Sequence, residues 1–223
     1  MTRVLRGDRP RGAARPPILV WVLGASFVLL IAALLIGSLT TPEFPPYPPT
    51  EPQPVAVGDS LVGPATYTID ASSPDRWRRF DFSRNAMVDS GGWDIAFRRT
   101  HVMAGEDVGL TDLGAVGFDS VGEVPATGYV VAVARADTNH PAIGKWYDYN
   151  YLTHLLVSKR HVYAVRTADG RFGKFEILSY YCAVVGTACV TFRYAYRGDG
   201  ARRLAAPARR PRNKTAPRGR RGR

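Results

Sequence analysis

The chain has 223 residues, 45% of them hydrophobic, and its 30 basic and 19 acidic residues give a net charge of +11. This charge sits at the two ends: residues 1–17 carry +4 and residues 201–223 carry +10, whereas the rest of the chain carries −3. A nucleic-acid-binding domain carries its basic residues on the folded core, so the distribution argues against nucleic acid as a partner.

An uncharged apolar run extends from Ile18 to Leu39. As a helix its 22 residues span about 33 Å, which is enough to cross a bilayer and too long for the apolar part of a signal peptide. No A-x-A-type cleavage site follows it. The run therefore predicts a retained transmembrane helix with the lipid bilayer as its partner; a cleaved signal sequence is the alternative.

Charges beside the run predict its orientation. Five arginines precede it, and no lysine or arginine follows until Arg76. The positive-inside rule places residues 1–17 in the cytoplasm and the C-terminal domain outside it, on the periplasmic face of a bacterial inner membrane. The basic C-terminal end lies too far from the span to reverse this orientation.

Two segments flank the expected folded domain. Residues 40–54 are rich in proline, which favours an extended polyproline stalk with a reach of about 40 Å. Residues 198–223 are basic and lack apolar periodicity, so they are predicted to be a disordered tail. The tail is expected either to be solvated or to contact anionic lipid or an acidic partner.

Residues 55–197 contain short alternating or aromatic-rich segments instead of long amphipathic helices. The pattern predicts a mainly β domain, an antiparallel β-sandwich-like fold preceded by one transmembrane helix. The candidate strands are Tyr67–Ile69, Trp77–Phe82, Trp93–Thr100 and a buried Tyr129–Ala134, while Trp146–Leu156 is either strand or irregular.

The clearest strands lie between His161 and Tyr196. Asp169-Gly170 separates two alternating runs and predicts a hairpin with a type I′ turn. A second hairpin passes a loop near Gly186 and leads into a strand with four large apolar residues on one face. The region therefore predicts a three-stranded meander.

Both cysteines flank the loop of this second hairpin. Cys182 and Cys189 are placed symmetrically about it, which brings the two side chains near each other. In an oxidising compartment the expected outcome is a disulfide. Free thiols and a metal site are the alternatives, the latter with only two thiols and no histidine nearby in sequence.

Four blocks resemble the HmuY family in their order along the chain: WDIAFRR at 93–99, GKWY at 144–147, YAVRTADGRFGKFEILSYY at 163–181 and TFRY at 191–194. The resemblance covers most of residues 67–196. It implies a compact all-β domain that binds haem between two side chains, commonly histidines. The chain departs from the family's lipid-anchored members because it has a membrane helix in place of a lipidated cysteine.

No histidine stands inside a matching block, so the haem-ligand candidates rest on local context. His101 follows the first block and precedes a glycine-rich stretch, and His154 lies among aromatic residues. His140 and His161 are the other histidines, and for each of the four an ordinary surface or hydrogen-bonded role is the competing interpretation. Met87 and Met103 are the methionines of the domain.

No catalytic motif and no metal loop is recognisable, so we expect neither catalytic residues nor a bound metal ion. The first hypothesis is a structural or interaction subunit that docks onto a membrane protein complex. The second is a haem-binding module for haem capture or electron transfer, with haem as its cofactor. A family fold does not by itself fix the function.

Overall fold

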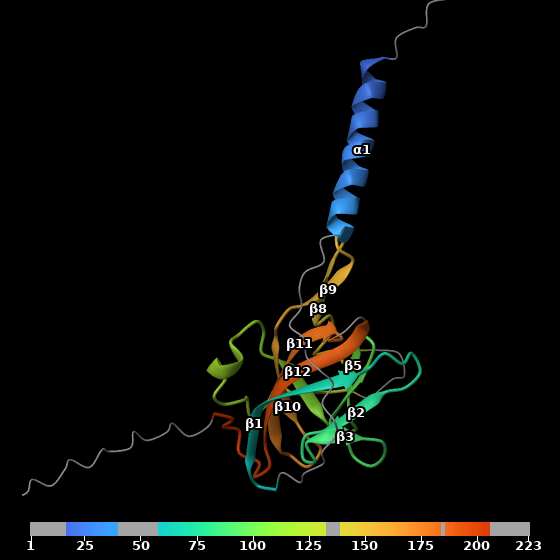
Figure 1. The fold of residues 1–223 in the computed structure, drawn as a ribbon. Helices are drawn as coiled ribbons and strands as arrows, with labels where there is room; N and C mark the ends of the chain where they lie inside the picture. The colour runs from blue at the N-terminus through green and yellow to red at the C-terminus, as the bar shows by residue number, and fades with distance from the viewer. Residues whose placement is uncertain (1–16, 40–57, 133–138, 184–185, 206–223) are drawn as a thin grey trace, which may run out of the picture. The chain divides into compact units, whose positions relative to one another are not determined.

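The computed structural model describes residues 17–39, 58–132, 139–183 and 186–205 (Figure 1). Helix α1 (Ile18–Leu39) coincides with the predicted apolar run and is long and apolar enough to cross a membrane. It belongs to a compact unit that also contains Tyr149–Leu155, and the β domain forms a second unit. The predicted stalk at 40–54 and residues 1–16 lie outside the described residues.

The β domain is built from antiparallel sheets, as the sequence predicted. One sheet has six strands in the order β1-β12-β11-β10-β6-β7, and a second has four in the order β3-β2-β4-β5. A third sheet pairs β8 with β9. The strands are β1 (Leu61–Asp70), β2 (Arg78–Asp81), β3 (Ala86–Val88), β4 (Ile95–Arg98), β5 (His101–Ala104), β6 (Gly109–Asp112), β7 (Val130–Val131), β8 (Tyr147–Asn150), β9 (Leu155–Ser158), β10 (Val162–Arg166), β11 (Phe172–Tyr181) and β12 (Thr187–Arg197).

Aromatic side chains fill the space between the six-stranded and four-stranded sheets. Phe80 of β2 lies edge-on to Phe192 of β12, with ring centroids 5.2 Å apart. Phe97 of β4 stacks on the same Phe192 ring at 5.3 Å. The contacts join the two sheets into a sandwich whose inner layer is apolar.

The opposite face of the six-stranded sheet carries a smaller cluster. A loop containing a short 3₁₀ helix (Phe118–Ser120) brings Phe118 and Val124 onto Val162, Ala164 and Ala195. Lys174 and Glu176 alternate with the inward-facing residues of β11, so they point to this outer face. Both are only 3% exposed because the loop and neighbouring side chains cover them.

The predicted meander is confirmed, since β10, β11 and β12 pair in sequence. Its first turn is not type I′, however. Thr167 and Arg171 close a three-residue loop through a backbone hydrogen bond, and in that loop Gly170 has a φ of +80° while Asp169 is not left-handed. A longer loop needs only one left-handed residue, so the prediction of two was wrong.

Two further predictions are corrected. The predicted buried strand at Tyr129–Ala134 is not found over its described residues, 129–132: β7 has two residues, and Val130 and Val131 are 42% and 46% exposed at the sheet edge. The predicted tail 198–223 begins too early, because Leu204 is buried in the outer-face cluster and its N–H donates to the Gly122 carbonyl. Residues 206–223 lie outside the described residues.

Candidate functional site

The two predicted haem-ligand candidates occupy different parts of the molecule. His101 begins β5, the edge strand of the four-stranded sheet, and is partly buried beside the nearly buried Met103. His154 lies in the compact unit that contains α1, and its Nδ1 is 2.7 Å from the Tyr149 hydroxyl. The structure therefore does not bring them together within one unit, and both stay predictions.

The other two histidines are held by interactions with the β domain. His140 is 3% exposed, and its Nδ1 accepts a hydrogen bond from the Ala142 N–H at 3.2 Å. Burial lowers the pKa of His140, so the ring is neutral near pH 7. His161 lies 2.9 Å from Asp112. Nothing in the sequence indicated that His140 would be the buried histidine, because it precedes Pro141 in an apparent turn.

An acidic cleft of about 430 Å³ opens on the β domain. Its lining includes the aromatic rings of Trp93 and Tyr196 and the carboxyl groups of Asp81, Asp94 and Asp169. Burial raises the pKa of Asp94 to about 7, and the neighbouring carboxylates act in the same direction. The Phe82 N–H donates to Asp94 at 2.8 Å and opposes the shift. This cleft disfavours anionic ligands.

An open groove of about 620 Å³ lies beside the loop that covers the outer face. Its walls are mainly apolar and include Val116, Val121 and Pro125. Arg202 also lines the groove, where its guanidinium group pairs with Glu123 at 2.6 Å and donates a hydrogen bond to the Val124 carbonyl. The groove could hold an apolar side chain, and its lining includes no histidine, methionine or cysteine that could serve as an axial haem ligand.

Haem imposes two requirements that the described residues can be tested against: one or two axial ligands and a cavity that holds the macrocycle. The cleft, the groove and two smaller cavities of about 270 and 230 Å³ are lined by described residues, and none of the four is lined by a histidine. Met87 borders the 270 Å³ cavity among arginines. These four cavities, as lined by the described residues, do not fit a haem held by histidines.

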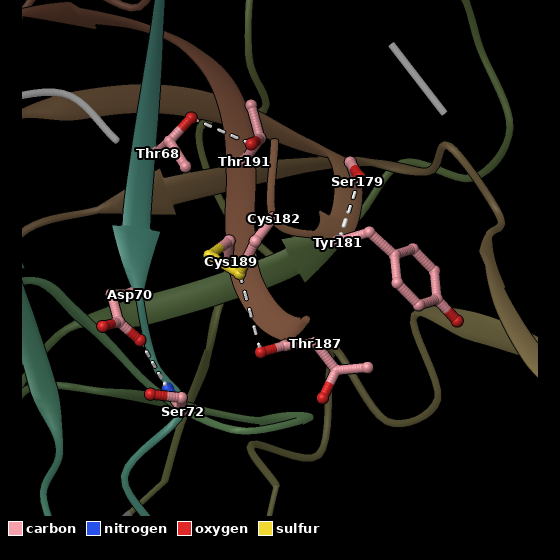
Figure 2. Close-up of a disulfide and its surroundings, with 9 residues drawn as sticks. All are labelled: Thr68, Asp70, Ser72, Ser179, Tyr181, Cys182, Thr187, Cys189 and Thr191. Atoms are coloured by element: carbon pink, nitrogen blue, oxygen red, sulfur yellow. Dashed lines mark hydrogen bonds between the residues drawn. A yellow bond between two sulfur atoms is a disulfide. The ribbon is translucent and has the colours of Figure 1, made fainter. Parts of the chain in front are cut away.

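Cys182 and Cys189 form a disulfide, as the spacing predicted (Figure 2). The bridge links the end of β11 to β12, beside the buried hydrogen bond between Thr68 and Thr191. Asp70, the register partner of Cys189 on β1, accepts the Ser72 N–H. The bridge thus lies where β1 and β11 end and β12 begins, and the two sulfurs are not available to a metal ion. No group of three or more potential metal ligands occurs among the described residues.

Solved structures share this fold at low sequence identity. A protein from Bacteroides vulgatus assigned as HmuY-like and haem-binding is 19% identical, with a TM-score of 0.50, and the match covers 62% of this chain and 96% of that one. A protein from Bacteroides fragilis assigned as a lipoprotein is 15% identical, with a TM-score of 0.50, over 63% and 91% of the two chains. The apo HmuY analog of Tannerella forsythia is 16% identical, with a TM-score of 0.48, over 62% and 97%.

No curated protein matches the chain. The family model of the HmuY protein matches residues 73–194, which include the blocks WDIAFRR and DGRFGKFEILSYY and the strands from β2 into β12. This match covers more than half of the chain. The family is one of binding proteins associated with haem, and the chain belongs to the HmuY family.

Proposed function

We propose that this chain is a membrane-tethered, non-enzymatic HmuY-family domain that acts as an interaction subunit. The observation that carries the proposal is the lining of the cavities. The domain has kept the family fold, whereas the four cavities described above include no histidine in their lining. Three histidines are held through Nδ1: His161 by Asp112, His154 by the Tyr149 hydroxyl and His140 by the Ala142 N–H.

The proposed location is the outer face of a bacterial inner membrane. Helix α1 is apolar along its whole length, and the arginines that precede it favour a cytoplasmic N-terminus. The β domain would then lie in the periplasm, where an oxidising environment maintains the Cys182–Cys189 bridge. The partner we expect is a protein of the same membrane, reached at a height that the stalk sets.

Haem binding is the second candidate function. Membership of the HmuY family supports it, as does the likeness to a protein assigned as HmuY-like and haem-binding. His101 is the histidine for which no side-chain hydrogen bond restricts the ring within the described part of the chain, so it is the residue to test first. His154 would have to give up the Tyr149 hydroxyl before its Nδ1 could bind iron.

A haem titration of the full chain in lipid nanodiscs separates the two functions. The wild-type chain is compared with His101→Ala and His154→Ala, and His161→Ala serves as the matched control because its ring is paired with Asp112. For an interaction subunit we expect a broad Soret band that does not saturate and is the same in all four chains. A sharp, saturable Soret band that weakens in His101→Ala or His154→Ala would overturn the proposal in favour of haem binding.

A further inference from the structure

The tip of the β8–β9 hairpin, Tyr149–Leu155, exposes large side chains without any charge. Tyr149, Tyr151 and Leu152 are 42%, 79% and 56% exposed. No Asp, Glu, Lys or Arg occurs between Tyr149 and Ser158. Asp148 and Lys159 flank this stretch and pair with each other at 3.6 Å. An uncharged aromatic tip with a charged base is unusual for a surface that faces only water.

Several polar groups of the tip have partners within the tip. The side-chain carbonyl of Asn150 accepts the backbone N–H groups of Leu152 and Thr153, at 2.9 and 3.1 Å. The Tyr149 hydroxyl and His154 Nδ1 form a hydrogen bond at 2.7 Å, and the rings of Tyr149 and Tyr151 pack edge to face at 5.0 Å. Because these groups already have partners, moving the tip out of water costs less than it would for an open loop.

Tyrosine and leucine are suited to the boundary between lipid headgroups and acyl chains. Tyrosine keeps an apolar ring and a polar hydroxyl together, and it is enriched at membrane interfaces for that reason. Asparagine and threonine tolerate the headgroup region, whereas the charged pair at the base, Asp148 and Lys159, favours water. The composition of the tip therefore matches an interfacial segment rather than a protein-binding surface with charged residues at its rim.

The tip also belongs to the compact unit that contains α1. We propose that Tyr149–Leu155 inserts into the headgroup–acyl boundary of the bilayer that holds α1, with Tyr151 and Leu152 entering deepest. This inference rests on the proposed membrane anchoring of α1. The tip would act as a second, shallow contact of the chain with the lipid.

The test is a lipid-quenching measurement on the full chain in phosphatidylcholine liposomes. Native cysteines are bridged, so a single introduced cysteine can be labelled with an environment-sensitive fluorophore. The labelled chains are Leu152→Cys in the tip, Val28→Cys in α1 and Thr127→Cys at an exposed position of the β domain. With a quencher on the acyl chains, labels at 152 and 28 are expected to lose roughly half of their emission, and the label at 127 almost none.

The three labels distinguish the two claims. If the label at 28 is quenched and the label at 152 is quenched as little as the label at 127, the insertion of the tip is overturned and the membrane anchor stands. A label at 28 that is not quenched would overturn the anchor and, with it, this inference. Adding Tyr151→Asp to the Leu152→Cys chain is expected to reduce quenching at 152, because a carboxylate is costly at this depth, whereas Thr127→Asp in the same chain leaves it unchanged.

Discussion

The two faces of the six-stranded sheet are both buried, but different interactions hold them. On the inner face, β12 contributes Phe192, Tyr194 and Tyr196 to an aromatic layer shared with the four-stranded sheet. On the outer face, β11 presents Lys174 and Glu176, each 3% exposed, beneath an irregular loop. The inner face is stabilised by apolar area and close packing. The outer face is stabilised by a smaller apolar cluster together with paired charges and hydrogen bonds to a loop.

The charges of the outer face have specific partners. Lys174 Nζ donates to the carbonyls of Phe118 and Val121, at 2.6 and 2.7 Å. Burial lowers the pKa of Lys174. Glu176 pairs with Arg193 at 3.0 Å and with Arg160 at 2.5 Å. A buried charge is tolerated when hydrogen-bond partners surround it. The loop carbonyls therefore stabilise the buried ammonium group of Lys174, and the ammonium group in turn holds the loop in place.

The largest expected effect is on the inner face. Phe192→Ala removes a ring that packs between Phe80 and Phe97 from the opposite sheet, and leaves a cavity there. We expect the free energy of unfolding to fall by about 3–5 kcal/mol. Urea unfolding of the full chain in detergent, followed by tryptophan fluorescence, measures the change. A loss below about 1 kcal/mol would mean that the two sheets do not share one core.

On the outer face the corresponding change is Lys174→Met, which keeps the length of the side chain and removes the donor. The carbonyls of Phe118 and Val121 lose this partner, so we expect a loss of about 1–3 kcal/mol. The effect should be local, with faster amide hydrogen exchange in the loop around Phe118 than in β11. Faster exchange throughout both sheets would show that this face is not a separate unit.

The disulfide lies at the end of the meander shared by the two faces. Cys189→Ser should lower the free energy of unfolding by about 1–3 kcal/mol under non-reducing conditions, because the bridge closes only a short loop. Reductant should lower the melting temperature of the wild-type chain to about that of the variant, and it should leave the melting temperature of the variant unchanged. A variant that melts like the oxidised wild type would contradict a stabilising bridge.

Asp94 is a buried acid of the cleft, on the four-stranded side of the sandwich. Its pKa in the folded chain is raised to about 7 from the ordinary value of 3.8. The folded state therefore binds more protons between these values, and this group's contribution to stability falls as the pH rises from about 4 to about 7. Asp94→Asn can still accept the Phe82 N–H and should raise stability at pH 8 by about 1–2 kcal/mol, with little change at pH 4.

The control for this pH dependence is Asp75→Asn, which removes an exposed carboxylate outside the cleft. It should leave the difference between pH 4 and pH 8 as it is in the wild type. If both variants show the same pH profile, the burial of Asp94 is not the cause of the slope. Thermal unfolding at three pH values between 4 and 8 is sufficient to compare them.

The sequence predicted the inner face better than the outer one. The alternating pattern in β12 predicted a strand and placed Phe192 on its apolar face, because successive side chains of a strand point to opposite faces. Alternation in β11 places Lys174 and Glu176 on one face, but it does not say what covers that face. The covering loop has no periodicity, and it is positioned by long-range contacts such as Lys174 with Phe118.

The candidate site was harder to predict for a related reason. The disulfide followed from local spacing about one hairpin, and it is confirmed. The hydrogen bond between Tyr149 and His154 was not foreseen, because sequence gives no reason to pair these two aromatic side chains. His140 is attached to β5 by a backbone hydrogen bond from its N–H to the Val102 carbonyl. No residue near Pro141 in the sequence predicts this contact.

The measurement that tests the proposed function most directly is the visible absorption spectrum of the full chain as purified from a haem-replete bacterial membrane. An interaction subunit whose described cavities have no histidine in their lining should be isolated without a Soret band, and reduction with dithionite should produce no haem bands. A stoichiometric Soret band that disappears in His101→Ala would contradict this account and establish the chain as a haem carrier of its family.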